Sequence, residues 1–284
     1  MKKYKFYFIF FSYILIIFLF YVHFKFLFFL LNIKKFFFKK NLFYYHSSLL
    51  DKYENGVSIC ITAFKSVKFI KDTLNSIANQ TWFKYHNNYE IILGIDGCNE
   101  TLNYIKTIKN NYKNLIIIMM KENKGTYITT NTIMTISKFD NIIRFDSDDI
   151  MFPNLVEKVI NQSKKYDMIR FKMKNFNIKT NETFLENAYG QFLIKHWIFD
   201  YFGGFLPWRC GADAEFIIRV KKFIKVLFLN ETLLLRKIHP ESLTQSNKTN
   251  FSSLERRSKF IYIEKITKNI KTLKEAKIEK VMNK

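Results

Sequence analysis

Apolar and polar positions alternate in regular blocks from Val57 onward. Short apolar runs bounded by polar turns predict strands at residues 57–62, 89–95, 114–120, 141–145 and 167–173. Between these runs the apolar residues recur at helical spacing, which predicts helices over residues 65–81, 101–112, 126–137 and 153–166. In the first helix the shared apolar face carries Val67, Ile70, Leu74 and Ile77. Strands that alternate with helices predict an α/β fold, a mostly parallel sheet flanked by helices.

The N-terminal segment has a different pattern. Residues 6–22 carry no formal charge and consist almost entirely of Phe, Ile, Leu and Tyr. A bilayer-spanning helix needs about 20 apolar residues, with a range of about 17–25, and no small-residue cleavage site follows the run. We therefore expect an N-terminal transmembrane helix that is retained, and a membrane protein with a single pass. Lysines flank the run on both sides, so its orientation stays open.

These patterns divide the chain into four parts. We expect a membrane anchor over residues 1–40, a stem over 41–56, an α/β domain over 57–250 and a basic helix over 251–284. The last segment repeats apolar residues on one helical stripe, at Phe260, Ile263, Ile266, Ile270 and Leu273. That stripe has two readings, because it suits packing on the domain as well as contact with an anionic membrane surface.

Composition and charge narrow the classes of protein. Hydrophobic residues make up 48% of the 284-residue chain, which supports a packed core and argues against general disorder. The 46 basic and 24 acidic residues give a net charge of +22, but the excess is spread along the chain. No run alternates arginine with aromatic residues, so we expect no nucleic-acid partner. The three cysteines have no CxxC spacing, which predicts free thiols and no zinc site.

Aspartates follow two of the predicted strands. Asp96 comes directly after the second strand, and Asp146, Asp148 and Asp149 follow the fourth. Ligands of parallel sheets bind beyond the carboxyl ends of the strands. Crowded ionised carboxylates are costly unless a cation or strong donors compensate them, so these residues predict a ligand site. The chain has neither GxGxxG nor GK[ST], which excludes a dinucleotide fingerprint and a P-loop.

Six segments, taken in order, resemble family-two glycosyltransferases with the GT-A fold: residues 57–82, 89–97, 122–131, 142–154, 203–220 and 235–244. The resemblance extends over residues 57–245, about two-thirds of the chain. It implies a GT-A (Rossmann-like) sheet that binds a nucleotide sugar, expected to be a UDP-sugar, beside a divalent metal, Mn²⁺ or Mg²⁺. Hard cations of this kind prefer oxygen ligands. The acceptor is expected to be a glycan, a protein or a lipid.

The resemblance also assigns roles to single residues. It implies nucleotide-sugar contacts at Thr62, Ala63, Asp96, Asn123, Gly125, Asp146 and Ser147. It implies metal or diphosphate contacts at Asp148, Asp149 and His239. Two registers of Asp-x-Asp fit residues 146–149, so the sequence leaves open which aspartate faces the ribose and which binds the metal.

The catalytic base of an inverting transfer is expected at Asp213, in the segment "GADAEF". The family usually has Glu-Asp here, but Ala212 stands in place of the glutamate and Glu215 lies two positions on. Glu215 is therefore the alternative base, and a third reading pairs both carboxylates with Arg209 or Arg219. Trp208 is expected either to shape an acceptor pocket or to pack in the core.

Three rival functions remain at this point. A phosphotransferase with an aspartyl nucleophile would require the motif Asp-x-Asp-x-Thr/Val. The chain lacks the final Thr or Val of this motif, because residues 146–150 end in Ile150. A basic membrane-associated binding protein without catalysis would not need the ordered motifs. A GT-A-like protein that has lost its activity is allowed by the altered Glu-Asp pair.

Overall fold

The computed structural model describes residues 52–279, and the described residues from Tyr53 onward belong to one compact unit. The predicted membrane anchor lies outside the described residues. Within residues 52–279, no helix has both the length and the apolar character needed to cross a bilayer. The cysteines Cys60, Cys98 and Cys210 are buried free thiols, as predicted.

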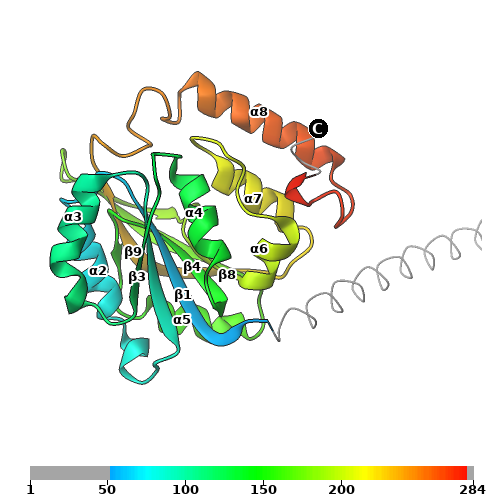
Figure 1. Ribbon diagram of the computed structural model, residues 1–284. Helices are drawn as coiled ribbons and strands as arrows, with labels where there is room; N and C mark the ends of the chain where they lie inside the picture. Colours follow the sequence, from blue (N-terminus) through cyan, green and yellow to red (C-terminus); the bar gives the residue numbers. More distant parts are fainter. Residues whose placement is uncertain (1–51, 280–284) are drawn as a thin grey trace, which may run out of the picture. The chain divides into compact units, whose positions relative to one another are not determined.

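The N-terminal half of the domain is a parallel sheet. Its strands lie in the order β3-β2-β1-β4 and are parallel throughout. Their bounds are β1 (Glu54–Ala63), β2 (Tyr89–Ile95), β3 (Leu115–Met119) and β4 (Phe139–Asp146). The connecting helices are α2 (Ile70–Ala78), η1 (Thr81–Lys84), α3 (Asn99–Ile108), η2 (Lys109–Asn111) and α4 (Thr126–Thr135). Each of the first four predicted strands is confirmed, and Figure 1 labels β1, β3 and β4 among them.

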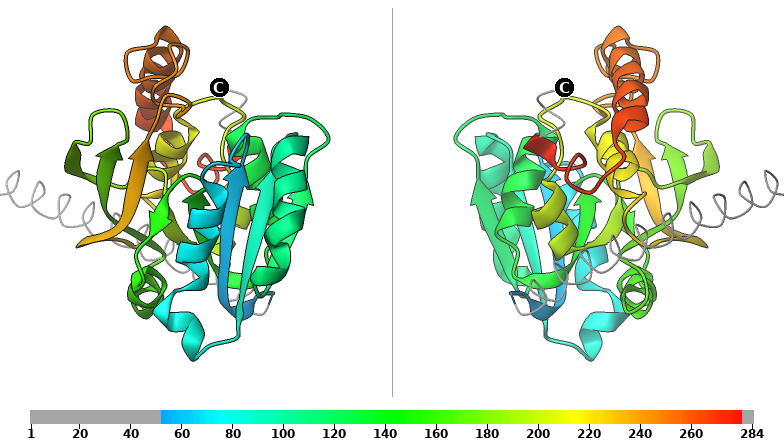
Figure 2. Two further views of the ribbon diagram at one scale, coloured as in Figure 1. Left: turned by 90° about the vertical axis from the view of Figure 1, so that its left-hand side faces the viewer. Right: turned by 90° about the vertical axis from the view of Figure 1, so that its right-hand side faces the viewer.

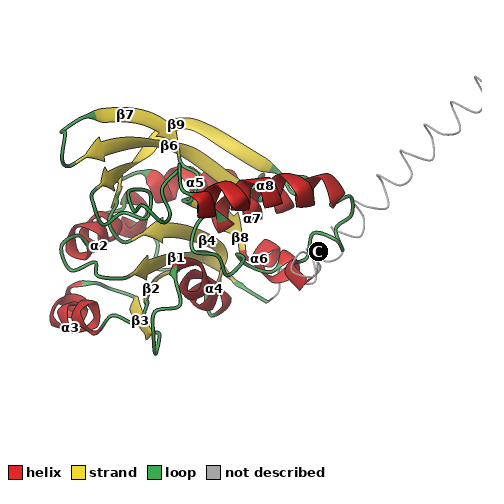
Figure 3. Ribbon diagram, turned by 90° about the horizontal axis from the view of Figure 1, so that it is seen from above, coloured by secondary structure: helices red, strands yellow, loops and turns green. Residues whose placement is uncertain are grey.

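The C-terminal half adds strands of both directions. Its elements are β5 (Ile150–Met151), α5 (Leu155–Ser163), β6 (Met168–Asn177), β7 (Thr183–Asn187), β8 (Phe192–Lys195), α6 (His196–Phe202), α7 (Ala212–Val220) and β9 (Val226–Ile238). The fifth predicted strand, β6, does not pair with β4. After a hairpin with β7 the chain returns as β8, which inserts between β4 and β6 and is antiparallel to both. The long strand β9 then pairs parallel to β6, and Figure 3 shows β6, β7 and β9 together at one side of the sheet.

Helices cover both faces of the parallel half. Alternate residues of β1, such as Ile59 and Ile61, belong to one buried apolar cluster with Leu74 of α2 and with α5 residues. Helix α4 packs against the other face. The packing is close at Gly94 of β2, where an added Cβ would lie 2.8 Å from side-chain atoms of Ile133 on α4. Figures 1 and 2 show these helix layers from three sides. The period-two alternation of β1 thus places a helix layer on each face.

The first predicted helix begins later than its apolar spacing indicated. Residues from Lys65 onward form turns, and α2 starts only at Ile70. The carbonyl of Ser66 accepts hydrogen bonds from the amides of Phe69 and Ile70, each at 2.9 Å. This turn brings the chain from the end of β1 onto the sheet face, so Val67 precedes the helix.

The C-terminal helix α8 (Leu254–Asn269) packs on the domain. It begins at Ser253, whose hydroxyl accepts a hydrogen bond from the amide of Arg256 at 3.2 Å. Ile263 and Ile266 of the predicted stripe are buried, while Phe260 remains 45% exposed. Of the two readings left open by the sequence, the structure therefore favours packing of the stripe against the domain.

A buried ion pair holds α7 to its neighbours. Glu215 and Arg219 lie one helical turn apart, are both fully buried, and pair at 2.7 Å between Oε1 and Nε. The guanidinium also donates to the carbonyls of Phe202 at 2.8 Å and Gly204 at 2.7 Å. A third donation, to the carbonyl of Ala276 at 3.2 Å, reaches the segment after α8. Arg219 therefore joins α7, the end of α6 and the C-terminal segment.

We expect Glu215→Gln to lower the free energy of unfolding by about 3–5 kcal/mol, because it leaves the Arg219 charge buried without its carboxylate. The matched control is Glu264→Gln, which breaks the exposed pair with Lys268 one turn apart on α8. That pair is expected to contribute only about 0.3–0.5 kcal/mol. Urea titration followed by circular dichroism measures both; equal losses would show that the buried pair has no special structural role.

Candidate active site

The predicted ligand residues of β1, β2 and β4 meet at one edge of the sheet. Thr62 lies opposite Gly94 of β2 on one side and opposite Asp146 of β4 on the other. Ala63 pairs with Ile95, the residue before Asp96. The carboxyl ends of three neighbouring strands thus bring Thr62, Ala63, Asp96 and Asp146 together, as the parallel topology predicted.

Asp96 holds the turn that contains Asn123 and Gly125. Its carboxylate is almost fully buried and accepts hydrogen bonds from the amides of Lys124 at 2.7 Å and Gly125 at 2.9 Å. The hydroxyl of Thr129 on α4 donates to the same group at 2.9 Å. Asp96 therefore positions this turn and the start of α4, a role that the sequence analysis missed. Asn123 itself is exposed at the rim.

Gly97 makes that arrangement possible. Its φ is +66°, a value that side chains disfavour, and a Cβ there would lie 2.2 Å from the amide nitrogen of Asn123. The turn after β2 can therefore approach the 122–125 loop only because residue 97 is a glycine.

Asp148 and His239 lie side by side. His239 Nε2 is 2.9 Å from Asp148 Oδ2, and the side chain of Asp148 is 28% exposed. The histidine ring also packs against Phe69, with centroids 4.3 Å apart. Its buried Nδ1 has no hydrogen-bond partner within the described part of the chain. The structure thus brings together two of the three residues predicted to bind metal.

Asp149 points elsewhere. Its carboxylate is buried, accepts a hydrogen bond from the amide of Lys237 at 2.9 Å, and contacts the side-chain amide of Gln191. Burial raises the pKa of Asp149 well above its usual range, and the nearby carboxylates of Asp148 and Asp146 raise it further. Both oxygens already join β9 and the segment before β8. This geometry favours a structural role for Asp149 over the predicted metal contact.

Ser147 is likewise turned into the protein. Its hydroxyl lies 2.8 Å from the hydroxyl of Ser66, and its carbonyl accepts a hydrogen bond from Thr73 at 3.0 Å. Thr73 also donates to the carbonyl of Asp149 at 2.8 Å. The hydroxyl predicted to contact the nucleotide sugar is therefore directed to the turn before α2, and the backbone carbonyls of the aspartate turn bind Thr73 of α2. Across residues 52–279, no group of three or more His, Cys, Asp or Glu side chains forms a metal cluster.

Arg144 connects the aspartates of β4 with α7. One terminal nitrogen pairs with Asp146 at 2.8 Å and the other contacts the carbonyl of Gly190. A Cβ at Gly190 would lie 2.9 Å from Arg144 Nη1 and 3.0 Å from Asp213 Oδ2. Arg144 and Asp213 therefore meet across a glycine that leaves no space for a side chain. The signal in the sequence was a charged residue within the apolar run of residues 141–145.

Asp213 and Glu215 have different environments in the first turn of α7. The hydroxyl of Tyr127 on α4 donates to Asp213 Oδ1 at 2.8 Å. Burial raises the pKa of Tyr127 well above its usual range, so this hydroxyl keeps its proton and remains a donor. Glu215 is held by Arg219, and Ala212 is fully buried where the family usually has a glutamate. Of the two alternatives, Asp213 is the carboxylate that lies near Tyr127 of α4 and Arg144 of β4.

A parallel sheet half with carboxylates at its strand ends, extended by mixed strands, is the arrangement of a GT-A-like fold. Among solved structures, Staphylococcus aureus TarS 1–349 in complex with UDP-GlcNAc matches with a TM-score of 0.58. The match covers 66% of this chain and 60% of that one, at 16% sequence identity. The complex of the same TarS fragment with UDP matches with a TM-score of 0.56 over similar shares.

The chain belongs to glycosyl transferase family 2, whose family model matches residues 58–226. An uncharacterized glycosyltransferase of Haemophilus influenzae is 32% identical over 114 residues, 40% of this chain and 34% of that protein. Poly(ribitol-phosphate) beta-N-acetylglucosaminyltransferase TarP of Staphylococcus aureus is also 32% identical over 114 residues, 38% of this chain and 33% of that protein. The chain matches about a third of the length of these relatives.

We expect Tyr127→Phe to lower the rate of sugar transfer roughly tenfold, because hydrogen bonds to charged groups contribute about 1.5–3 kcal/mol. The ring still fills its site, so donor affinity is expected to stay unchanged. Tyr112→Phe is the matched control, since that buried hydroxyl donates to Asn75 Oδ1 at 2.9 Å on α2. Steady-state kinetics decide; equal effects of the two variants would mean that Tyr127 has no special relation to the reaction.

Proposed function

We propose that this protein transfers a sugar from a UDP-sugar to an acceptor hydroxyl by a single displacement with inversion. The observation that carries the proposal is the position of Asp213, held by Tyr127 beside Arg144 while Glu215 is locked by Arg219. Membership of glycosyl transferase family 2 supports the reaction class. The TarS complexes with UDP and UDP-GlcNAc, and the name of TarP, support the donor class.

The donor is proposed to bind along the strand ends. Thr62 and Ala63 end β1, and Asp96, which follows the neighbouring strand β2, fixes the turn of Asn123 and Gly125. We propose that the nucleotide base binds at these strand ends. Asp146 is 36% exposed in its side chain and has the Arg144 guanidinium on one side. This orientation suits a contact to the ribose.

A divalent cation fits the remaining pair. Asp148 and His239 offer an oxygen and a nitrogen at 2.9 Å, with Asp148 partly exposed, and such ions are often held by one or two side chains together with substrate phosphates. When bound, the cation offsets negative charge on the leaving diphosphate. Asp149 is proposed to orient this pair through Lys237, which lies two residues before His239. The crowding of Asp146, Asp148 and Asp149 also favours a compensating positive charge.

The base step is assigned to Asp213. Its carboxylate takes the proton from the acceptor hydroxyl as the oxygen attacks the anomeric carbon and the bond to the diphosphate breaks. Tyr127 orients one carboxylate oxygen, and the other lies toward Gly190 and Arg144. The Arg144 charge also helps to keep Asp213 and Asp146 compatible at one site.

Membrane attachment is proposed through the apolar residues 6–22, on the sequence pattern alone. This attachment would hold the domain near a membrane-associated acceptor. We propose no nucleic-acid partner.

Asp148→Ala is expected to abolish metal-dependent binding of the UDP-sugar while the fold stays intact, because it removes the carboxylate of the Asp148–His239 pair. Asp140→Ala is the matched control, since Asp140 lies on the same strand, β4, and pairs with Lys195. Isothermal titration calorimetry with and without a chelator provides the measurement. Donor affinity that responds to neither Asp148→Ala nor the chelator would remove the metal from the proposal.

Asp213→Asn is expected to lower transfer by about 10²–10⁴-fold, the usual contribution of general-base catalysis. Donor binding should change little, because the substitution keeps the shape and lies outside the Asp148–His239 pair. Glu215→Gln, compared per folded molecule, should cost much less. If the two effects are reversed, Glu215 is the base; if neither matters, the single displacement must be abandoned.

Removal of residues 1–40 is expected to release the protein from membranes without loss of transfer activity, because the proposed anchor lies outside the catalytic domain. Membrane flotation and sodium carbonate extraction of both forms measure the attachment. A full-length protein that carbonate frees from the membrane would contradict a spanning anchor.

A further inference from the structure

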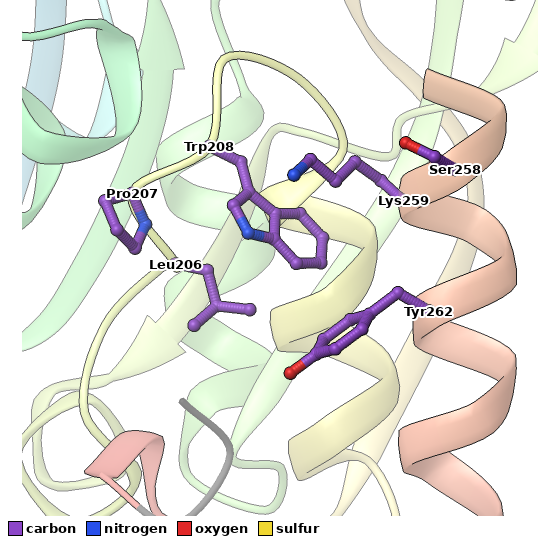
Figure 4. A pocket seen from close by; sticks show the side chains of 6 residues that line it. All are labelled: Leu206, Pro207, Trp208, Ser258, Lys259 and Tyr262. Atoms are coloured by element: carbon purple, nitrogen blue, oxygen red, sulfur yellow. The ribbon is translucent and has the colours of Figure 1, made fainter. Parts of the chain in front are cut away.

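A pocket of about 400 Å³ lies between the segment before α7 and the C-terminal helix α8. The first wall is formed by Leu206, Pro207 and Trp208, and the second by Ser258, Lys259 and Tyr262. Figure 4 shows Trp208 and Tyr262 facing each other, with the Lys259 chain extending from α8 toward the indole. The volume is within the range of about 300–1,000 Å³ that is common for small-molecule sites. The second wall lies outside residues 58–226, the part that the family model matches.

The pocket is next to the start of α7, where the proposed base lies. A Cβ built at Gly211 would lie 3.9 Å from the Cβ of Lys259, and Asp213 follows two residues later. Both groups lie near the thiol of Cys210. Burial raises the pKa of this thiol, and among the smaller effects of nearby charges, Lys259 lowers the pKa and Asp213 raises it. Lys259 and Asp213 therefore flank the same short turn.

The lining suits a polyol or sugar that carries negative charge. The Lys259 ammonium is 4.7 Å from the centre of the Trp208 ring, and the Trp208 and Tyr262 rings meet edge to face at 5.5 Å. The rings of Trp208 and Tyr262 provide apolar surface with a polar group at one end, which suits the carbon chain and hydroxyls of such ligands. Within residues 52–279, no carboxylate lies within ion-pairing distance of Lys259, so its charge is available to an anion.

We propose that this pocket binds the acceptor and that Lys259 contacts a phosphate group on it. The proposal rests on the function proposed above and extends it to the acceptor class. Lys259 lies on α8, outside the residues that the family model matches, so this helix recognises the negative charge of the acceptor. Trp208 packs along the acceptor's carbon chain, and the hydroxyl that attacks lies toward Asp213.

The test is calorimetry on the full chain in detergent with UDP and Mn²⁺ present. The probes are ribitol 5-phosphate, glycerol 3-phosphate and glucose 6-phosphate, each beside its phosphate-free counterpart. For at least one pair, the wild-type protein should bind the phosphorylated compound roughly tenfold more tightly, as expected for one hydrogen bond to a charged group. Lys259→Ala should remove that preference. Lys265→Ala, which removes an exposed lysine elsewhere on α8, should keep it. Trp208→Ala should weaken both members of each pair.

A wild-type protein that prefers none of the phosphorylated compounds would overturn the proposal, as would an unchanged preference in Lys259→Ala. UDP-sugar binding and turnover are measured separately on the same preparations. Their loss would refute the proposed function, whereas a missing phosphate preference beside intact donor binding would refute only the acceptor assignment.

Discussion

The hydrogen bonds of the Asp149 carboxylate determine the geometry of the proposed donor site. Asp149 is buried in the turn after β4 and accepts a hydrogen bond from the amide of Lys237, 88 residues away in the sequence. This contact brings the end of β9 to the aspartate turn, so that His239 lies beside Asp148. Asp149, the third aspartate of the cluster, is therefore used for contacts inside the protein. The two that precede it remain partly exposed, at 36% for Asp146 and 28% for Asp148.

A second buried carboxylate has the same kind of role on α7. Glu215 neutralises Arg219, whose guanidinium also donates to the carbonyls of Phe202 and Gly204 at the end of α6 and to that of Ala276 after α8. Removing one partner of such a pair is costly, because the other charge stays buried. The pair fixes the rotation of α7, and Asp213, half a turn earlier, then faces Tyr127 and Gly190. In both places one acidic residue stabilises the fold and its neighbour remains available for chemistry.

The sequence predicted the parallel half of the fold well, because apolar runs such as residues 89–95 are continuous and bounded by polar turns. It did not predict the insertion of β8 between β4 and β6, since strand order depends on contacts between distant segments. Nor did it distinguish Asp149 from Asp148. The distinction lies in Lys237 and Gln191, far along the chain, and no local pattern encodes those partners. The sequence placed the base at Asp213 and left Glu215 open as the alternative, because the contacts of Arg219 with Glu215 cannot be read from the sequence.

We propose that donor, cation and base meet where β1, β2 and β4 end beside the start of α7. A crystal structure with UDP and Mn²⁺, with anomalous scattering recorded at the manganese edge, tests it most directly. We expect one manganese peak at Asp148 and His239, UDP along Thr62 and Asp96, and an unbroken contact between Asp149 and Lys237. A manganese ion on Asp149 with that contact broken, or UDP bound away from these strand ends, would contradict the account.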